Sequence, residues 1–185
     1  VSLNREIAMI TGTNEGGKTV FVKSILIAQF FYQLGFPVPA ESAEIGASDS
    51  IVSVFAKEEL GAIGSGRLGE ELKKLSAALE KIKAGNCFFC FNEPLTATGS
   101  HDSIVIMSNI SLTLQQNAAR GLWVTHLLKL ASAYQLFNNQ SDGSKIKSLV
   151  AVVEGSGDAV KPRYKIIEGE AALTSYAKQT VARHT

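Results

Sequence analysis

Hydrophobic residues recur along the chain in two patterns, one helical and one typical of buried strands. Residues 68–84 carry an apolar side chain at every third or fourth position, which places these side chains on one face of a helix. The positions are Leu68, Leu72, Leu75, Leu79 and Ile82. Glutamates at the start of this segment and lysines at its end match the dipole of the predicted helix. Short apolar runs at 7–11 and 87–91 instead predict strands.

The two patterns alternate to the end of the chain, and this alternation predicts an α/β fold with a mostly parallel sheet between helical layers. The expected strands are 7–11, 87–91, 122–125, 148–153 and 164–167, and the expected helices are 18–34, 68–84, 102–119, 127–137 and a segment after 171. The turn-rich residues 155–158 favour a hairpin between the last two strands. Because residues 18–34 are apolar on nearly every side, we expect this helix to be buried, with Phe30, Phe31 and Tyr32 in the core.

Composition indicates one globular domain with a core of its own. Of the 185 residues, 45% are hydrophobic and 19% are charged, which excludes a disordered or disulfide-stapled chain. The net charge is +1 without any block of five like charges, so the sequence has no electrostatic footprint for nucleic acid or anionic lipid. No apolar run approaches the ~18 residues that cross a bilayer, so no membrane partner is expected. Since the sequence begins at Val1 without a signal pattern, we expect residues 1–185 to be a fragment of a longer protein.

Cys87 and Cys90 have the CxxC spacing of redox and zinc sites, but their context favours a structural role. Side chains three residues apart on a strand point to opposite faces, so the two thiols could not share a metal ion. We therefore expect buried, reduced thiols, which are consistent with a cytoplasmic protein.

Residues 12–19 fit the phosphate-binding pattern GxxxxGK[ST] and lie between a predicted strand and a predicted helix. Glycines let the loop curl so that backbone N–H groups face phosphate oxygens, and the helix N-terminus adds positive charge. Lys18 would reach the terminal phosphates and the Thr19 hydroxyl would bind Mg²⁺. The alternative is a glycine turn that happens to precede a lysine. The predicted nucleotide-binding residues are Gly12, Thr13, Asn14, Glu15, Gly16, Gly17, Lys18, Thr19 and Val20.

Asn92 and Glu93 follow an apolar strand, as the acidic residues of a Walker B segment do. An asparagine brings an amide oxygen but no charge, so Asn92 and Thr19 would hold Mg²⁺ weakly. Glu93 would act as the general base for an attacking water, unless it is merely a solvent-facing residue. His126 follows the next predicted strand, and we expect it to sense the terminal phosphate; the alternative is a capping or surface histidine.

Several stretches of the chain together resemble the C-terminal ATPase domain of the MutS family of DNA mismatch-repair proteins, a branch of the ABC-type P-loop ATPases. They are residues 8–19 (AMITGTNEGGKT), 37–46, 92–102, 124–126 (VTH) and 164–169. The resemblance implies a single ATPase domain with the P-loop NTPase fold, with ATP and Mg²⁺ as its ligands. It also implies that the strands preceding residue 7 in that family are absent, and that other parts of the parent protein bind DNA.

The resemblance further implies a homodimer with nucleotide sites shared between the two subunits. Ser65 and Gly66 fit the family's signature segment loosely, and Ser100 and Asp102 correspond to the loop that crosses the dimer interface. Asn92 replaces the family's aspartate, so the chain resembles a divergent member. Two functions stay open: Mg²⁺-dependent ATP hydrolysis coupled to DNA binding, and a nucleotide-gated dimerisation module with little hydrolysis. A P-loop kinase is a weaker third option, because no lid arginines are visible.

Overall fold

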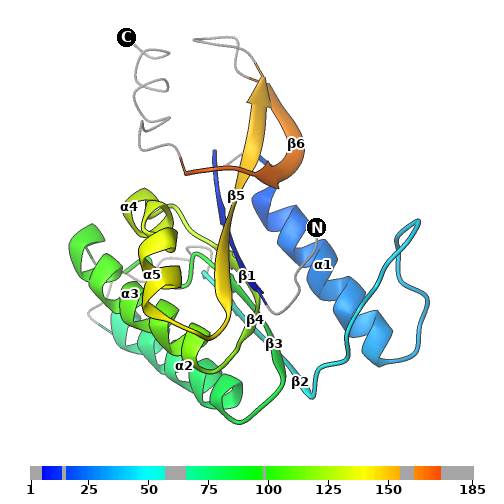
Figure 1. Ribbon diagram of the computed structural model, residues 1–185, viewed down its shortest axis with the longest axis horizontal. Coiled ribbons are helices and arrows are strands. Elements are labelled where there is room, and N and C mark those ends of the chain that lie inside the picture. Colours follow the sequence, from blue (N-terminus) through cyan, green and yellow to red (C-terminus); the bar gives the residue numbers. More distant parts are fainter. Residues whose placement is uncertain (1–5, 14–15, 57–65, 98, 155–160, 172–185) are drawn as a thin grey trace.

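The fold was analysed in a computed structural model that describes residues 6–13, 16–56, 66–97, 99–154 and 161–171 (Figure 1). Its strands are β1 (Glu6–Thr11), β2 (Ser50–Phe55), β3 (Cys87–Asn92), β4 (Arg120–Val124), β5 (Lys145–Glu154) and β6 (Lys161–Glu168). Its helices are α1 (Lys18–Gln33), α2 (Arg67–Lys83), α3 (Ser100–Gln116), α4 (Leu128–Ser132) and α5 (Tyr134–Gln140). The alternation of strands and helices expected from the sequence is therefore confirmed.

The strands form one sheet in the order β2-β3-β4-β1-β5-β6. All neighbouring pairs are parallel except β5 and β6, which form the expected antiparallel pair. Parallel strands all end at the same edge of a sheet, and here the segments that follow β1, β3 and β4 leave from that edge. The topology therefore brings the predicted loop at 12–19, Asn92–Glu93 and His126 to one side of the molecule.

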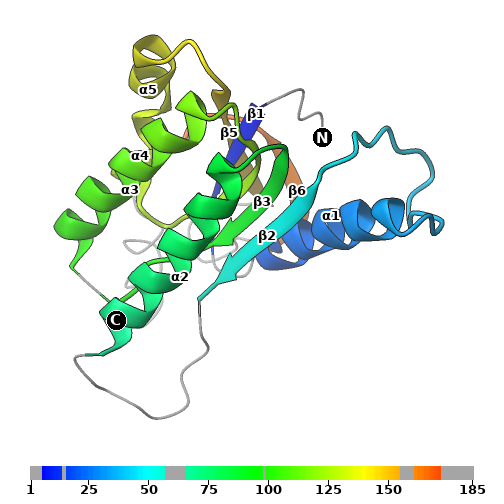
Figure 2. The same ribbon diagram turned by 90° about the horizontal axis from the view of Figure 1, so that it is seen from below.

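Alternate residues of each central strand face opposite layers, as the short apolar runs require. In β1, Ile7 and Met9 join a large core with α2, α3, α4 and α5, whereas Ala8 and Ile10 join a smaller core with α1. Figure 2 shows α1 alone on one side of the sheet and the other helices on the opposite side. The three-layer arrangement expected from the sequence is thus observed.

The two cysteines also follow this alternation. Cys87 belongs to the large core and Cys90 to the smaller one, and both are buried free thiols. The expectation that the two side chains point to opposite faces of the strand is confirmed. Burial raises the pKa of Cys90 to about 12, so this thiol is unreactive at neutral pH.

Helix α1 is less buried than its composition predicts. Val22 is fully buried against the smaller core, but Phe30 is 51% exposed and Phe31 and Tyr32 are exposed as well. The expectation that these aromatic residues lie in the core is therefore wrong. A single helix on one face of a sheet has a partner on one side only, so apolar residues on its other sides face outward in the described part of the chain.

Three further differences concern element boundaries. The strand β2 was not predicted, because SIVSVF follows a polar loop and lies at the edge of the sheet. Helix α3 begins two residues earlier than expected and stops at Gln116, because Ala118 adopts a left-handed conformation with φ 49°. The expected helix at 127–137 is two short helices that meet at Ala133.

The expected helix after 171 lies outside the described residues. No helix in the described parts of the chain is long and apolar enough to cross a membrane.

Candidate functional site

The loop between β1 and α1 has a backbone shape that only glycine adopts easily. Gly12 has φ 130° and Gly17, directly before the first residue of α1, has φ 79°. A methyl group added to Gly12 would lie 2.7 Å from the Ala151 Cβ on β5, and one added to Gly16 would lie 2.8 Å from it. Gly12 is therefore needed both for the turn and for close packing on β5, Gly16 for the packing and Gly17 for the turn.

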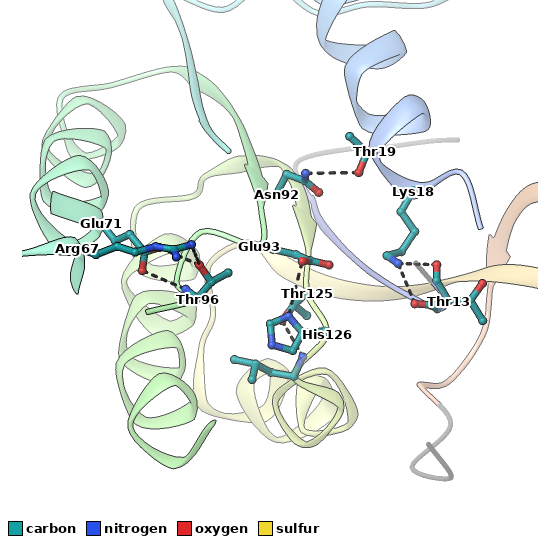
Figure 3. Close-up of polar contacts among 12 residues, drawn as sticks. Thr13, Lys18, Thr19, Arg67, Glu71, Asn92, Glu93, Thr96, Thr125 and His126 are labelled. Atoms are coloured by element: carbon teal, nitrogen blue, oxygen red, sulfur yellow. Dashed lines mark hydrogen bonds and ion pairs between the residues drawn. The ribbon is translucent and has the colours of Figure 1, made fainter. Parts of the chain in front are cut away.

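Lys18 is buried within this loop although it is charged. Its ammonium donates hydrogen bonds to the carbonyl oxygens of Gly12 at 2.8 Å and Thr13 at 2.7 Å, and its residue is 3% exposed (Figure 3). Burial lowers the pKa of Lys18, and the nearby charge of Glu93 opposes this shift. A cation held at the start of a helix, inside a glycine loop, is the arrangement that an anionic phosphate group would complete.

Asn92 and Thr19 meet at the end of β3 next to the first turn of α1. The Asn92 Nδ2 lies 3.5 Å from the Thr19 hydroxyl oxygen, and the Asn92 Oδ1 is buried without a hydrogen-bond partner. An unsatisfied buried oxygen normally has a ligand, water or ion as its partner. Together with the hydroxyl it fits a Mg²⁺ ion that takes most of its ligands from phosphate and water, because Mg²⁺ binds oxygen donors. No cluster of three His, Cys, Asp or Glu residues within the described ranges could hold a metal on its own.

Glu93 directly follows β3 and has a conformation that is rare for a residue with a side chain. Its φ is 50°, and its backbone N–H donates to the Val124 carbonyl at 3.0 Å. This turn brings its carboxylate toward His126, whose Nδ1 lies 3.8 Å from the Glu93 Oε2. The two side chains are 29% and 54% exposed, so both can meet a molecule from solvent. Such strained backbone is found most often at functional sites.

His126 is fixed by its neighbour Thr125. The Thr125 N–H donates to the Ile10 carbonyl at 3.1 Å, and the Thr125 hydroxyl accepts a hydrogen bond from the Leu127 N–H. The first bond joins the segment after β4 to the end of β1, and the second closes a turn around His126. The histidine therefore has a defined place at the same sheet edge as Lys18.

The structure brings Lys18, Thr19, Asn92, Glu93 and His126 to one edge of the sheet, although they are up to 108 positions apart in the sequence. The other predicted site residues have different placements. Val20 is 72% exposed on α1, Gly66 immediately precedes α2, and Ser100 and Asp102 are exposed in the first turn of α3. Asn14, Glu15 and Ser65 lie outside the described residues. The roles assigned to all these residues stay predictions.

Two residues near this site were missed by sequence reasoning. Ala151 on β5 packs against the glycine loop. In the sequence, a small apolar residue of a strand indicates only that it is buried. Glu71 accepts hydrogen bonds from the loop after Glu93. In the sequence it is an ordinary acidic residue near the start of a helix. Contacts between distant elements gave no local signal that could have found either one.

The chain is similar to a known protein family. A family model described as MutS domain V matches residues 8–184. The DNA mismatch repair protein MutS of Orientia tsutsugamushi (strain Ikeda) is 30% identical over 177 residues, which cover 94% of this chain and 19% of that protein. The Thermus aquaticus protein of the same name is 25% identical over 71% of this chain and 16% of its own length. Human DNA mismatch repair protein Msh3 is 25% identical over 84% of this chain and 14% of its own length. The chain thus spans about a fifth or less of these relatives.

Proposed function

The chain belongs to the MutS family, whose domain V it matches, and we propose that it binds ATP in the loop between β1 and α1 and hydrolyses it with the help of Mg²⁺. The observation that carries this proposal is the placement of Lys18. Within the described residues, its buried ammonium donates hydrogen bonds to carbonyl oxygens of the loop, at the N-terminus of a 16-residue helix. A polyphosphate would offer this cation stronger, charged acceptors.

In this proposal the residues at the sheet edge divide the chemistry among them. Lys18 exchanges its carbonyl partners for phosphate oxygens, and backbone N–H groups of the loop bind the remaining oxygens. Glu93 accepts a proton from the water that attacks the terminal phosphorus atom, as the bond to ADP breaks. His126, paired with Glu93, orients that water or the phosphate. A bound Mg²⁺, held by the Thr19 hydroxyl and the Asn92 amide oxygen, would offset the negative charge of the phosphates.

The partners proposed for the whole protein come from its relatives. The relatives are named as DNA mismatch repair proteins, so we propose that ATP binding by this domain serves DNA repair through regions of the parent protein outside these residues. We further propose that the domain works as a homodimer. Gly66, Ser100 and Asp102 are exposed, as residues that contact a second subunit must be in the free domain.

The neutral side chain of Asn92 favours a second candidate function, a module that dimerises on binding ATP but hydrolyses it slowly. With an amide in place of a carboxylate, the metal site lacks a negative charge from the protein. ATP binding alone would then shift the balance between monomer and dimer.

One titration tests the first step common to both functions. We expect labelled ATP to bind the chain, and Lys18→Ala to weaken binding by roughly tenfold or more through the loss of a charge-assisted contact. Lys23→Ala on the same helix is the matched control. Lys23 is exposed, and its ammonium lies over the ring of Phe55 rather than inside the glycine loop. Equal affinities for the three proteins would refute the proposal. If ATP binds, Glu93→Gln decides between the functions, since a hydrolytic enzyme loses turnover and a dimerisation module does not.

A further inference from the structure

A carboxylate on α2 holds the loop that follows Glu93. The Glu71 Oε2 accepts hydrogen bonds from the backbone N–H groups of Thr96 and Ala97, each at 3.0 Å, and its Oε1 accepts one from the Thr96 hydroxyl at 2.9 Å. Arg67, one turn earlier on α2, donates to the Thr96 hydroxyl at 3.2 Å and lies 3.6 Å from the Glu71 Oε1. The Glu71 side chain is 12% exposed, so water competes little with these bonds (Figure 3).

These contacts lie three residues downstream of the strained turn at Glu93. A residue with a side chain adopts φ near 50° only where its surroundings hold it there. On the upstream side the turn is fixed by β3 and by the hydrogen bond from the Glu93 N–H to the Val124 carbonyl. On the downstream side Leu95 is buried in the large core, and Thr96, the next residue, is hydrogen-bonded to Glu71.

We infer that Glu71 is a positioning residue for Glu93, which fixes the far side of the turn and thereby the direction of the Glu93 carboxylate. The inference rests on the proposed function for the role of Glu93 as general base. Three hydrogen bonds converge on the two oxygens of Glu71, and a carboxylate can accept them all. A glutamine has only one accepting oxygen and turns an NH2 group toward one set of donors, so it cannot hold the loop in the same way.

The first test needs no nucleotide and uses the full chain. His126 is paired with Glu93, so its ring signals in NMR spectra report the place of the Glu93 carboxylate. We expect Glu71→Gln to shift these signals in the direction of Glu93→Gln. Glu80→Gln is the matched control, because Glu80 lies on the same helix, is 70% exposed and pairs with Lys83. Ring signals of Glu71→Gln that match those of Glu80→Gln would overturn the inference.

The second test separates positioning from general support of the fold. In Mg-ATP we expect Glu71→Gln to lower turnover about tenfold, while the dissociation constant for ATP changes by less than about twofold, because only the orientation of the base is disturbed. Combined with Glu93→Gln, the same substitution should cause no further loss. An equal loss in both backgrounds would overturn the inference, since Glu71 would then act independently of Glu93. A chain that does not bind ATP would refute the proposed function, and the His126 signals would still decide on Glu71.

Discussion

Ala151 tests whether packing beneath the glycine loop sets its affinity for ATP. This residue is 3% exposed on β5, and its Cβ lies beneath both Gly12 and Gly16. Ala151→Val would add two methyl groups to a crowded contact. A single methyl group added to Gly12 or Gly16 would already lie only 2.7 or 2.8 Å from the Ala151 Cβ. The strand is hydrogen-bonded to β1 on one side and to β6 on the other, so we expect the loop to move rather than the strand.

The size of the effect follows from the cost of overpacking. Extra methyl groups in a packed site typically cost about 1–3 kcal/mol. If the displaced loop must regain its shape to bind phosphate, that energy is subtracted from the binding energy. At about 1.4 kcal/mol for each factor of ten, ATP should bind roughly 5- to 150-fold more weakly.

The assay compares two buried alanines. Ala119→Val adds the same volume to a residue that is also 3% exposed. Ala119, however, lies directly before β4, at the end of the strands opposite the glycine loop. Urea denaturation measures the loss of stability of each variant, and titration with labelled ATP measures affinity. We expect both variants to be destabilised and only Ala151→Val to lose affinity. The reasoning is refuted if Ala151→Val binds ATP as tightly as Ala119→Val does.

Three further predictions concern the metal site and the core. Asn92→Asp should lower the Mg²⁺ concentration that ATP binding requires, since it adds a carboxylate beside Thr19. A magnesium titration that is the same for both proteins would contradict the proposed ligands. The pKa of Cys90 is about 12 in the fold against 9.0 for a free thiol, so between these values the thiol is protonated in the folded chain and ionised in the unfolded chain. Its contribution to stability is therefore complete below pH 9 and is lost as the pH rises toward 12. Stability measured over that range should therefore fall by up to about 1.4 kcal/mol per pH unit more in the native chain than in Cys90→Ala. Gly121→Ala should lower the free energy of unfolding by about 1–3 kcal/mol in urea, because its new methyl group would overlap the Phe89 carbonyl; a stability equal to the native chain would show that the strands shift easily.

The sequence by itself determined the alternation of strands and helices, the mostly parallel sheet and the glycine loop before Lys18. These features depend on local rules, namely the spacing of apolar residues and the backbone freedom of glycine, which a linear sequence displays directly. It also placed Asn92, Glu93 and His126 at one sheet edge, because parallel strands that end in polar residues must deliver them to the same side.

The tertiary structure alone decided which surfaces of these elements have partners. Helix α1 has the composition of a buried helix, but among the described residues it packs on one side only, so Phe30 and its neighbours are exposed. Segments that are distant in sequence meet at the edge strand β2, at the close contact of Ala151 with the glycine loop, and at the hydrogen bonds that Thr96 donates to Glu71. Contacts of this kind depend on the distances and directions between packed elements, and no periodicity within a single segment encodes them.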